Sequence, residues 1–131
     1  MSKDAVLQMI KDEDAEYVDI RFTDPRGKLQ HVTVMAEQVD EDFLEEGFMF
    51  DGSSIAGWKS IEASDMKLMP DTNSAYVDPF YAEKTICIHC SVVEPDTGEA
   101  YERDPRGTAE KAEAYLKSSG IGDVAYMGPE A

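Results

Sequence analysis

Residues 84–93 are the stretch that most constrains the fold of this chain. The stretch is rich in β-branched residues, and apolar side chains occupy consecutive positions such as Ile86, Cys87 and Ile88. A strand with one solvated face alternates apolar and polar residues, whereas a strand that is covered on both faces does not. We therefore predict that residues 84–93 form the longest strand and lie at the centre of a sheet.

Cys87 and Cys90 have a C-x-x-C spacing with His89 between them, a pattern typical of zinc sites and redox-active cysteine pairs. Residues three apart on a strand point to opposite faces of the sheet. The two thiols therefore cannot easily share a metal ion or form a disulfide with each other. We predict two inert cysteines.

A hairpin is predicted near the N-terminus, after a short first helix that Ser2 can cap. Apolar and polar residues alternate in residues 18–23 and again in 29–35, which is the pattern of half-buried strands. Residues 24–27, Asp-Pro-Arg-Gly, have the chemistry of a tight turn. His31 is expected to be an exposed residue on the second strand.

Short helices and strands are predicted for the middle of the chain. Residues 37–46 read as an acidic helical segment that Gly47 ends. Short strands are expected near residues 66–68 and 75–77. Together with the hairpin and the central strand, they predict an α+β fold in which helices pack on a mixed sheet.

A last helix is predicted to begin at Asp104, as N-cap, with Pro105 in the first helical position. Gly120 has the chemistry of its C-terminal cap, and residues 124–127 are expected to start a final strand. The helical residues that we expect to face inward are Ala109, Ala112, Tyr115 and Leu116.

Residues 49–58 are predicted to form a loop with an acid, Asp51, and two hydroxyls, Ser53 and Ser54. Asp and Ser side chains bond readily to nearby backbone, and glycines such as Gly52 and Gly57 allow sharp turns. The composition is therefore compatible with a structural turn. A functional loop is the alternative, because loops often carry binding and catalytic residues.

The charge balance excludes some classes of partner. The chain of 131 residues holds 28 acidic and 12 basic residues, for a net charge of −16. Nucleic-acid binding is disfavoured because phosphate contacts need clustered Lys and Arg. Cations such as metal ions, ammonium or a basic patch on another chain are the attractive partners. The first residues lack a signal-peptide pattern, and no apolar run approaches the ~18 residues of a membrane span, so a cytoplasmic protein is expected.

Several co-linear motifs resemble the N-terminal portion of type I (bacterial) glutamine synthetases. They are Phe-Asp-Gly-Ser-Ser-Ile-Ala-Gly-Trp at residues 50–58, Ser-Asp-Met-Lys-Leu-Met-Pro-Asp at 64–71, Arg-Asp-Pro-Arg at 103–106 and Gly-Pro-Glu-Ala at 128–131. The resemblance implies a β-grasp domain over residues 1–103 and the beginning of a larger catalytic domain over 104–131. Complete members of this family are several times longer.

The resemblance also implies a chemistry. These ligases form glutamine from glutamate, ammonia and ATP through γ-glutamyl phosphate, with two Mg²⁺ or Mn²⁺ ions per site in a dodecamer of two stacked hexamers. The N-terminal domain closes the active site of the neighbouring subunit. Asp51 matches the family's ammonium-binding acid, Ser54 matches a serine of the same latch loop, and Glu130 matches the first metal-binding acid of a Gly-Pro-Glu-x-Glu motif. The second acid of that motif would follow Ala131.

The resemblance leaves other interpretations open. Asp65 could contact the neighbouring site or be an ordinary turn acid. The 131-residue chain is expected to be inactive alone, because most of the family's metal and phosphate ligands belong to the longer protein. A stand-alone β-grasp interaction module is the alternative function. A small acidic metal-binding protein is disfavoured because the sequence lacks a ligand loop such as an EF-hand.

Overall fold

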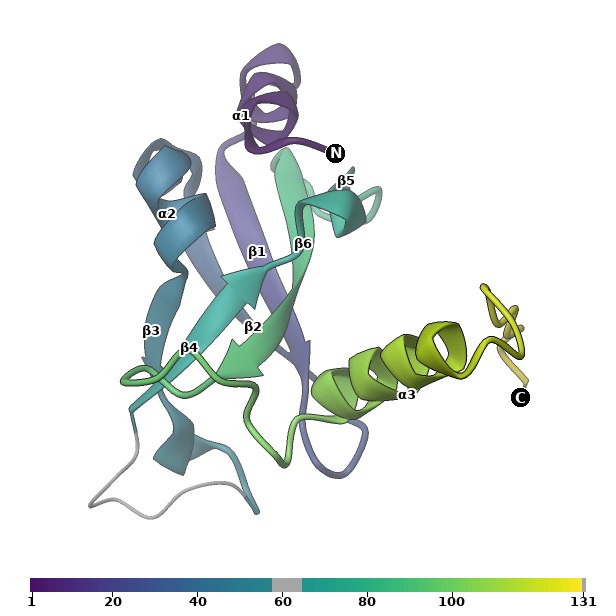
Figure 1. Ribbon diagram of the computed structural model, residues 1–131. Coiled ribbons are helices and arrows are strands. Elements are labelled where there is room, and N and C mark those ends of the chain that lie inside the picture. Colours follow the sequence, from purple (N-terminus) through teal and green to yellow (C-terminus); the bar gives the residue numbers. More distant parts are fainter. Residues whose placement is uncertain (58–64, 131) are drawn as a thin grey trace.

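A six-stranded mixed sheet forms the centre of the computed structural model, which describes residues 1–57 and 65–130. The strands are β1 (Tyr17–Thr23), β2 (Leu29–Met35), β3 (Phe48–Asp51), β4 (Asp65–Pro70), β5 (Tyr76–Val77) and β6 (Thr85–Val93). Their order is β2-β1-β6-β4-β3, and the short β5 pairs with the first part of β6 (Figure 1). β1 and β6 are parallel, and the other pairs are antiparallel.

The prediction of a long central strand is confirmed by β6, which pairs with β1 along one edge and with β5 and β4 along the other. Ile86, Ile88 and Val92 belong to the hydrophobic core, as does Cys90. Cys87 lies outside that core cluster, and its Sγ is 3.5 Å from the carboxylate of Asp78. The two cysteines therefore lie on opposite faces of β6, as the strand geometry predicts, and both are free thiols.

The helices are α1 (Lys3–Asp12), α2 (Glu41–Glu46) and α3 (Pro105–Ser119), with short 3₁₀ turns at Ala36–Gln38, Gly52–Ser54 and Thr72–Ser74. α1 and α2 lie together at one end of the sheet, opposite the end at which β3 leads into residues 52–57 (Figure 1). Their apolar sides supply Val6, Ile10 and Leu44 to a core shared with the strands. This arrangement confirms the α+β layer of helix on sheet.

Local capping follows the predicted chemistry at both chain ends. The Ser2 side chain accepts a hydrogen bond from the Ala5 amide and caps α1. Asp104 caps α3 by accepting from the Arg106 amide, and Gly120 ends α3 with φ of 72°. The hairpin of β1 and β2 turns at Gly27, where φ is 82°. His31 is exposed on β2, as predicted.

Three predictions about elements were wrong. Residues 49–51 belong to strand β3 and not to a loop, because Phe48 and Phe50 alternate with exposed residues and pair with β4. Residues 124–127 form no strand, since the described chain offers them no pairing partner. The predicted inner side of α3 faces outward: Ala109, Ala112 and Tyr115 are exposed and Leu116 is half-buried. Trp58 lies outside the described residues.

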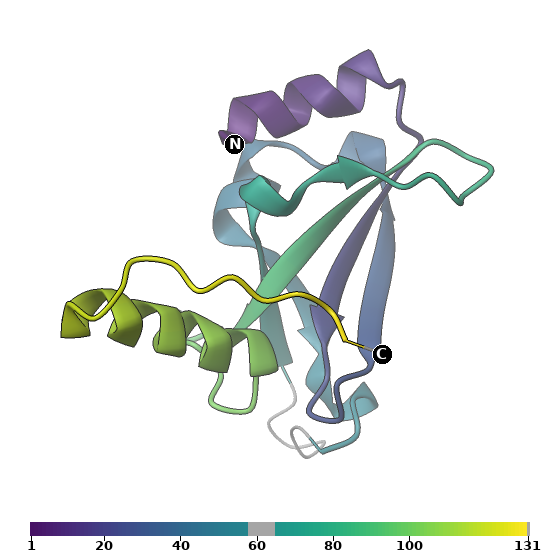
Figure 2. The same cartoon turned by 90° about the vertical axis from the view of Figure 1, so that its right-hand side faces the viewer.

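α3 and the tail that follows it project away from the sheet in Figure 1, and Figure 2 shows the tail running back beside the helix. A pocket of about 480 Å³ lies between α3 and the tail. Large apolar side chains that line it are exposed, with 72% of Tyr115 and 89% of Met127 accessible to solvent. Within the described residues, no helix combines the length and the apolarity needed to cross a membrane.

Candidate functional site

Asp51 is the last residue of β3 and lies directly opposite Asp65 in the antiparallel register with β4. Both acids are exposed. Side chains opposite each other in such a pair are close neighbours, and like charges in these positions repel. The structure therefore brings two sequence-predicted acids together at one sheet end. The negative potential that they create there favours a cation.

The Asp51 carboxylate also organises the turn that follows β3. Its Oδ1 accepts hydrogen bonds from the Ser53 amide at 2.9 Å and from the Ser53 hydroxyl at 2.6 Å. The Ile55 amide donates to the Gly52 carbonyl at 3.1 Å and closes the 3₁₀ turn. Asp51 is thus a turn former, as the structural interpretation predicts, and its exposed position also suits ligand binding. Ser54 is exposed on the same turn.

Side-chain contacts, besides the pairing of β3 with β4, hold the strand and the loop to the rest of the molecule. The Phe50 ring packs on the buried Phe22 ring, with 5.1 Å between the ring centroids. At the far end of the loop, Arg103 Nη1 donates to the Gly57 carbonyl at 2.8 Å. Residues 52–57, called loop 52–57 below, are therefore fixed by contacts at each end.

Glu130 is exposed in the tail after α3 and lies in no helix or strand. Among residues 1–57 and 65–130, no group of three or more His, Cys, Asp or Glu side chains is arranged to hold a metal ion. Carboxylate oxygens are suitable donors for Mg²⁺ or Mn²⁺, but these ions need several ligands. Glu130 alone therefore does not constitute a metal site.

The cysteines have the properties of buried structural thiols. Burial raises the pKa of Cys87 to about 11 and raises the pKa of Cys90 further. Reactive cysteines and metal-binding cysteines need an accessible thiolate near neutral pH. The raised pKa values agree with the prediction of inert cysteines.

A polar network that we did not predict lies on the second face of the sheet, the face that carries Asp19 and Arg21 of β1. Buried Asp19 accepts hydrogen bonds from Arg21 Nε at 2.8 Å, His31 Nδ1 at 2.7 Å and Thr33 Oγ1 at 2.8 Å. The other side of the Arg21 guanidinium donates to Asp78 Oδ2 at 2.8 Å. Asp19 and Arg21 alternate with apolar residues on β1. This pattern predicts a polar face that is exposed to solvent, and not a buried network of charges. The charges in it are paired, which is typical of a structural role.

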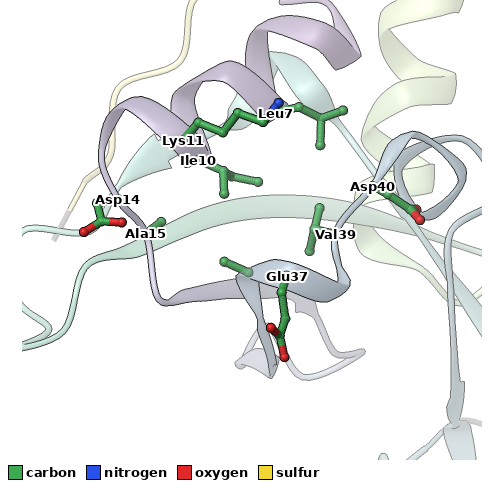
Figure 3. Close-up of a pocket in the computed structure, with 9 residues that line it drawn as sticks. Leu7, Ile10, Lys11, Asp14, Ala15, Glu37, Val39 and Asp40 are labelled. Carbon is green, nitrogen blue, oxygen red and sulfur yellow. The ribbon is translucent and has the colours of Figure 1, made fainter.

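A pocket of about 440 Å³ lies between α1 and residues 36–40 (Figure 3). Its apolar wall includes Ile10, Ala36 and Val39, which are already buried. A ligand would therefore cover little additional apolar surface there. Helix α1, which lines this pocket, lies at the end of the sheet remote from loop 52–57 (Figure 1). The candidate site is consequently the β3 end with Asp51, Asp65 and loop 52–57.

Comparison with known proteins shows which family the chain resembles. A family model described as "Glutamine synthetase, beta-Grasp domain" matches residues 14–95. A protein of Cereibacter sphaeroides named glutamine synthetase is 79% identical over 132 residues, which cover 100% of this chain and 28% of that protein. A protein of Cupriavidus pinatubonensis named 3-hydroxylaminophenol mutase is 58% identical over 125 residues, covering 95% of this chain and 26% of that protein.

A solved structure titled as the Plasmodium falciparum glutamine synthetase superimposes with a TM-score of 0.82. It is 24% identical to this chain, and the match covers 92% of this chain and 23% of that one. At this identity the likeness supports the fold alone. The chain thus spans about 28% of the length of the bacterial synthetase named above.

Proposed function

The chain belongs to the glutamine synthetase family, as its β-grasp domain, and from that premise we propose that it is the N-terminal part of a glutamate–ammonia ligase. The complete protein would form glutamine from glutamate, ammonia and ATP in the cytoplasm, through γ-glutamyl phosphate. The relative with 79% identity, named glutamine synthetase, supports this activity over that of the mutase, which has 58%. A stand-alone interaction module is disfavoured because both relatives are several times longer than the matched part.

The proposed division of the chain places the β-grasp domain in residues 1–103 and the start of the catalytic domain in 104–131. The family match over residues 14–95 lies within the first part. The projection of α3 and the tail away from the sheet supports the second part as a separate unit (Figure 1). In the complete protein, the exposed apolar side of α3 would be covered by the rest of that domain.

Asp51 is proposed to bind ammonium at the active site of a neighbouring subunit in a dodecamer of two stacked hexamers. The position opposite Asp65 carries this proposal, because two facing carboxylates attract a monocation. Asp51 would accept a proton from ammonium, and the resulting ammonia would attack the γ-carbonyl carbon of γ-glutamyl phosphate. The new carbon–nitrogen bond forms as the carbon–oxygen bond to phosphate breaks. Ser54 is assigned a positioning role on the same turn.

Metal and nucleotide binding are proposed only for the complete protein. A carboxylate at Glu130 would be one ligand for Mg²⁺ or Mn²⁺, two of which would sit in each site. The described residues do not complete such a site. ATP would be bound as a co-substrate outside the matched domain. The present chain alone is therefore expected to lack synthetase activity.

Asp51→Asn in the complete protein tests the ammonium role. The amide oxygen of Asn can still accept from Ser53, so the turn is retained while the charge is lost. Asp51 is exposed in this chain, but the neighbouring subunit would cover it in the assembled protein, and loss of one partner of a buried ion pair costs roughly 2–5 kcal/mol. At ~1.4 kcal/mol per decade, the Michaelis constant for ammonium should rise about 30-fold to a few thousand-fold.

The Michaelis constants for glutamate and ATP should change much less, because the residues proposed to bind these two substrates lie outside the matched domain. Asp96→Asn, which removes an exposed acid from the turn after β6, is the matched control. Steady-state kinetics with each substrate varied provide the measurement. A similar loss for all three substrates would assign Asp51 to the architecture of the loop instead of to cation binding.

A further inference from the structure

Short-range hydrogen bonds hold the first half of loop 52–57. The Asp51 carboxylate and the Gly52 carbonyl hold residues 53 and 55, respectively. At the other end, Gly57 has φ of 87°, which few residues other than glycine adopt. Its carbonyl accepts from Arg103 Nη1, a donor 46 residues further along the chain. The second half of the loop is thus positioned by a long-range contact.

The backbone that carries Arg103 is fixed on both sides. Tyr101, which is 6% exposed, donates its amide to the Val92 carbonyl at 2.9 Å. Asp104, which is 1% exposed, accepts from the Val92 amide at 2.8 Å and donates its own amide to the Tyr101 carbonyl at 3.0 Å. Arg103 therefore extends from a segment that is bonded to the central strand on both sides. A rigid base of this kind makes its guanidinium a defined anchor point for the loop.

We propose that Arg103 is a positioning residue that holds loop 52–57, and with it Asp51 and Ser54, in the arrangement that binds ammonium. This inference rests on the proposed function and extends it to a residue that lies outside the β-grasp match at 14–95. Asp104, the residue after Arg103, is also the N-cap of α3. The hydrogen bond from Arg103 to Gly57 therefore links loop 52–57 to the start of the proposed catalytic domain. Small shifts of α3 would thereby reach the loop through one side chain.

Arg103→Ala in the complete protein tests the proposal by two independent measurements. The Michaelis constant for ammonium should rise roughly 10- to 150-fold, the range expected for losing a hydrogen bond from a charged donor. The constant for glutamate should change less than about twofold, since the loss acts on the ammonium loop. Hydrogen exchange of the amides in loop 52–57 should become faster. The unfolding midpoint should stay unchanged because the contact is exposed.

Two further variants separate positioning from charge and from general stability. Arg103→Lys keeps one cationic donor and should restore the ammonium constant to within about threefold of the parent value. Arg26→Ala is the matched control: Arg26 is exposed on the turn beside the loop, where Pro25 Cγ would lie 3.8 Å from a Cβ at position 57. Arg26→Ala also removes one positive charge but leaves the Arg103–Gly57 hydrogen bond in place. This variant should change neither the Michaelis constant for ammonium nor hydrogen exchange in loop 52–57.

Unchanged exchange and an unchanged ammonium constant in Arg103→Ala would overturn the inference, as would an equal rise for all substrates. The outcome for Asp51→Asn distinguishes this failure from failure of the proposed function. If Asp51→Asn weakens ammonium use but Arg103→Ala does not, the function stands and the positioning role is wrong. If Asp51→Asn has no effect while loop exchange accelerates in Arg103→Ala, the contact positions the loop and the ammonium function is wrong.

Discussion

Asp19 is a buried carboxylate whose charge depends on three side chains from two strands. Burial opposes its ionisation, but hydrogen bonds from Arg21, His31 and Thr33 outweigh burial and lower its pKa below 3.8. Asp78, on the other side of Arg21, also has a lowered pKa, mainly because the Phe80 amide donates to it. The two acids make Arg21 a bridge between β1 and the segment after β5. The bridge stabilises the second face of the sheet without apolar packing.

Acidification should therefore destabilise the protein in a defined window. Because the folded pKa of Asp19 and Asp78 is lower than the unfolded pKa, the unfolded state binds more protons in acid. The stabilisation is complete above about pH 4 and is lost as the pH falls through the lowered pKa values. Asp19→Asn should reduce this pH dependence and lower the free energy of unfolding at pH 7 by about 3 kcal/mol.

Denaturant unfolding of the 131-residue chain at several pH values checks this, with Asp123→Asn as control because Asp123 is exposed in the tail. Parallel stability curves for the parent chain and Asp19→Asn in acid would mean that other carboxylates control the transition.

Strand β6 is the element on which the others depend. It pairs with β1, β4 and β5, and its Val92 amide donates to the N-cap residue of α3. Asp104 is both the α3 N-cap and the acceptor for the Val92 amide of β6. Burial raises the pKa of Asp104, although backbone amides donating to it oppose that effect. One side chain thus begins a helix and also satisfies an amide of the central strand.

Gly47 joins α2 to β3 at a point where both backbone conformation and space require glycine. Its φ is 83°, and a Cβ there would lie 2.6 Å from the Leu68 carbonyl oxygen. Gly47→Ala should destabilise the chain by about 2–4 kcal/mol, from the clash together with the backbone conformation, whose positive φ and ψ of −178° are essentially restricted to glycine. Gly27→Ala is the matched control, since Gly27 has φ of 82° but no atom within 4 Å of a Cβ.

The control should cost only about 1–2 kcal/mol, which is the conformational part. Thermal unfolding of both variants measures the difference. Equal destabilisation would show that β3 and β4 move apart to accommodate the methyl group at Gly47.

Elements with local signals were predictable from the sequence, and elements set by distant pairing were not. Caps such as Ser2, Asp104 and Gly120 act within one turn, so their residue types identify them. Strand β3 was read as a loop because its hydrogen bonds go to β4, beyond residues 58–64. The buried charge of Asp19 was likewise hidden, since its partners His31 and Thr33 lie on the neighbouring strand β2.

The residues of the candidate site were likewise predictable from local motifs, whereas their contacts with distant segments were not. Motif resemblance identified Asp51 and Ser54, but their spatial relation to Asp65 needed the β3–β4 register. The Arg103 contact with Gly57 had no sequence signal, because it spans 46 residues and joins two irregular segments. Roles for Asp51, Ser54 and Glu130 stay predictions until the complete protein is measured.

At the scale of the whole molecule, the chain has a buried centre and an uncovered end. Leu68 on β4 is completely buried, whereas Tyr115 on α3 is 72% exposed and Leu116 is half-buried. Apolar side chains of the tail, such as Val124 and Met127, line the same pocket as Leu116. An exposed apolar surface of this kind is typical of a face that another part of a protein covers.

Leu116→Ala should therefore have different effects in two contexts. In the 131-residue chain it should cost less than about 1 kcal/mol, because water already reaches that side chain, whereas Leu68→Ala should cost about 2–5 kcal/mol. In the complete protein, coverage of α3 should raise the cost of Leu116→Ala to the range of a buried leucine. Denaturant unfolding of the chain and hydrogen exchange across α3 in the complete protein provide the comparison. A small effect of Leu116→Ala in both contexts would mean that this side of α3 stays exposed and that residues 104–131 do not join a larger domain.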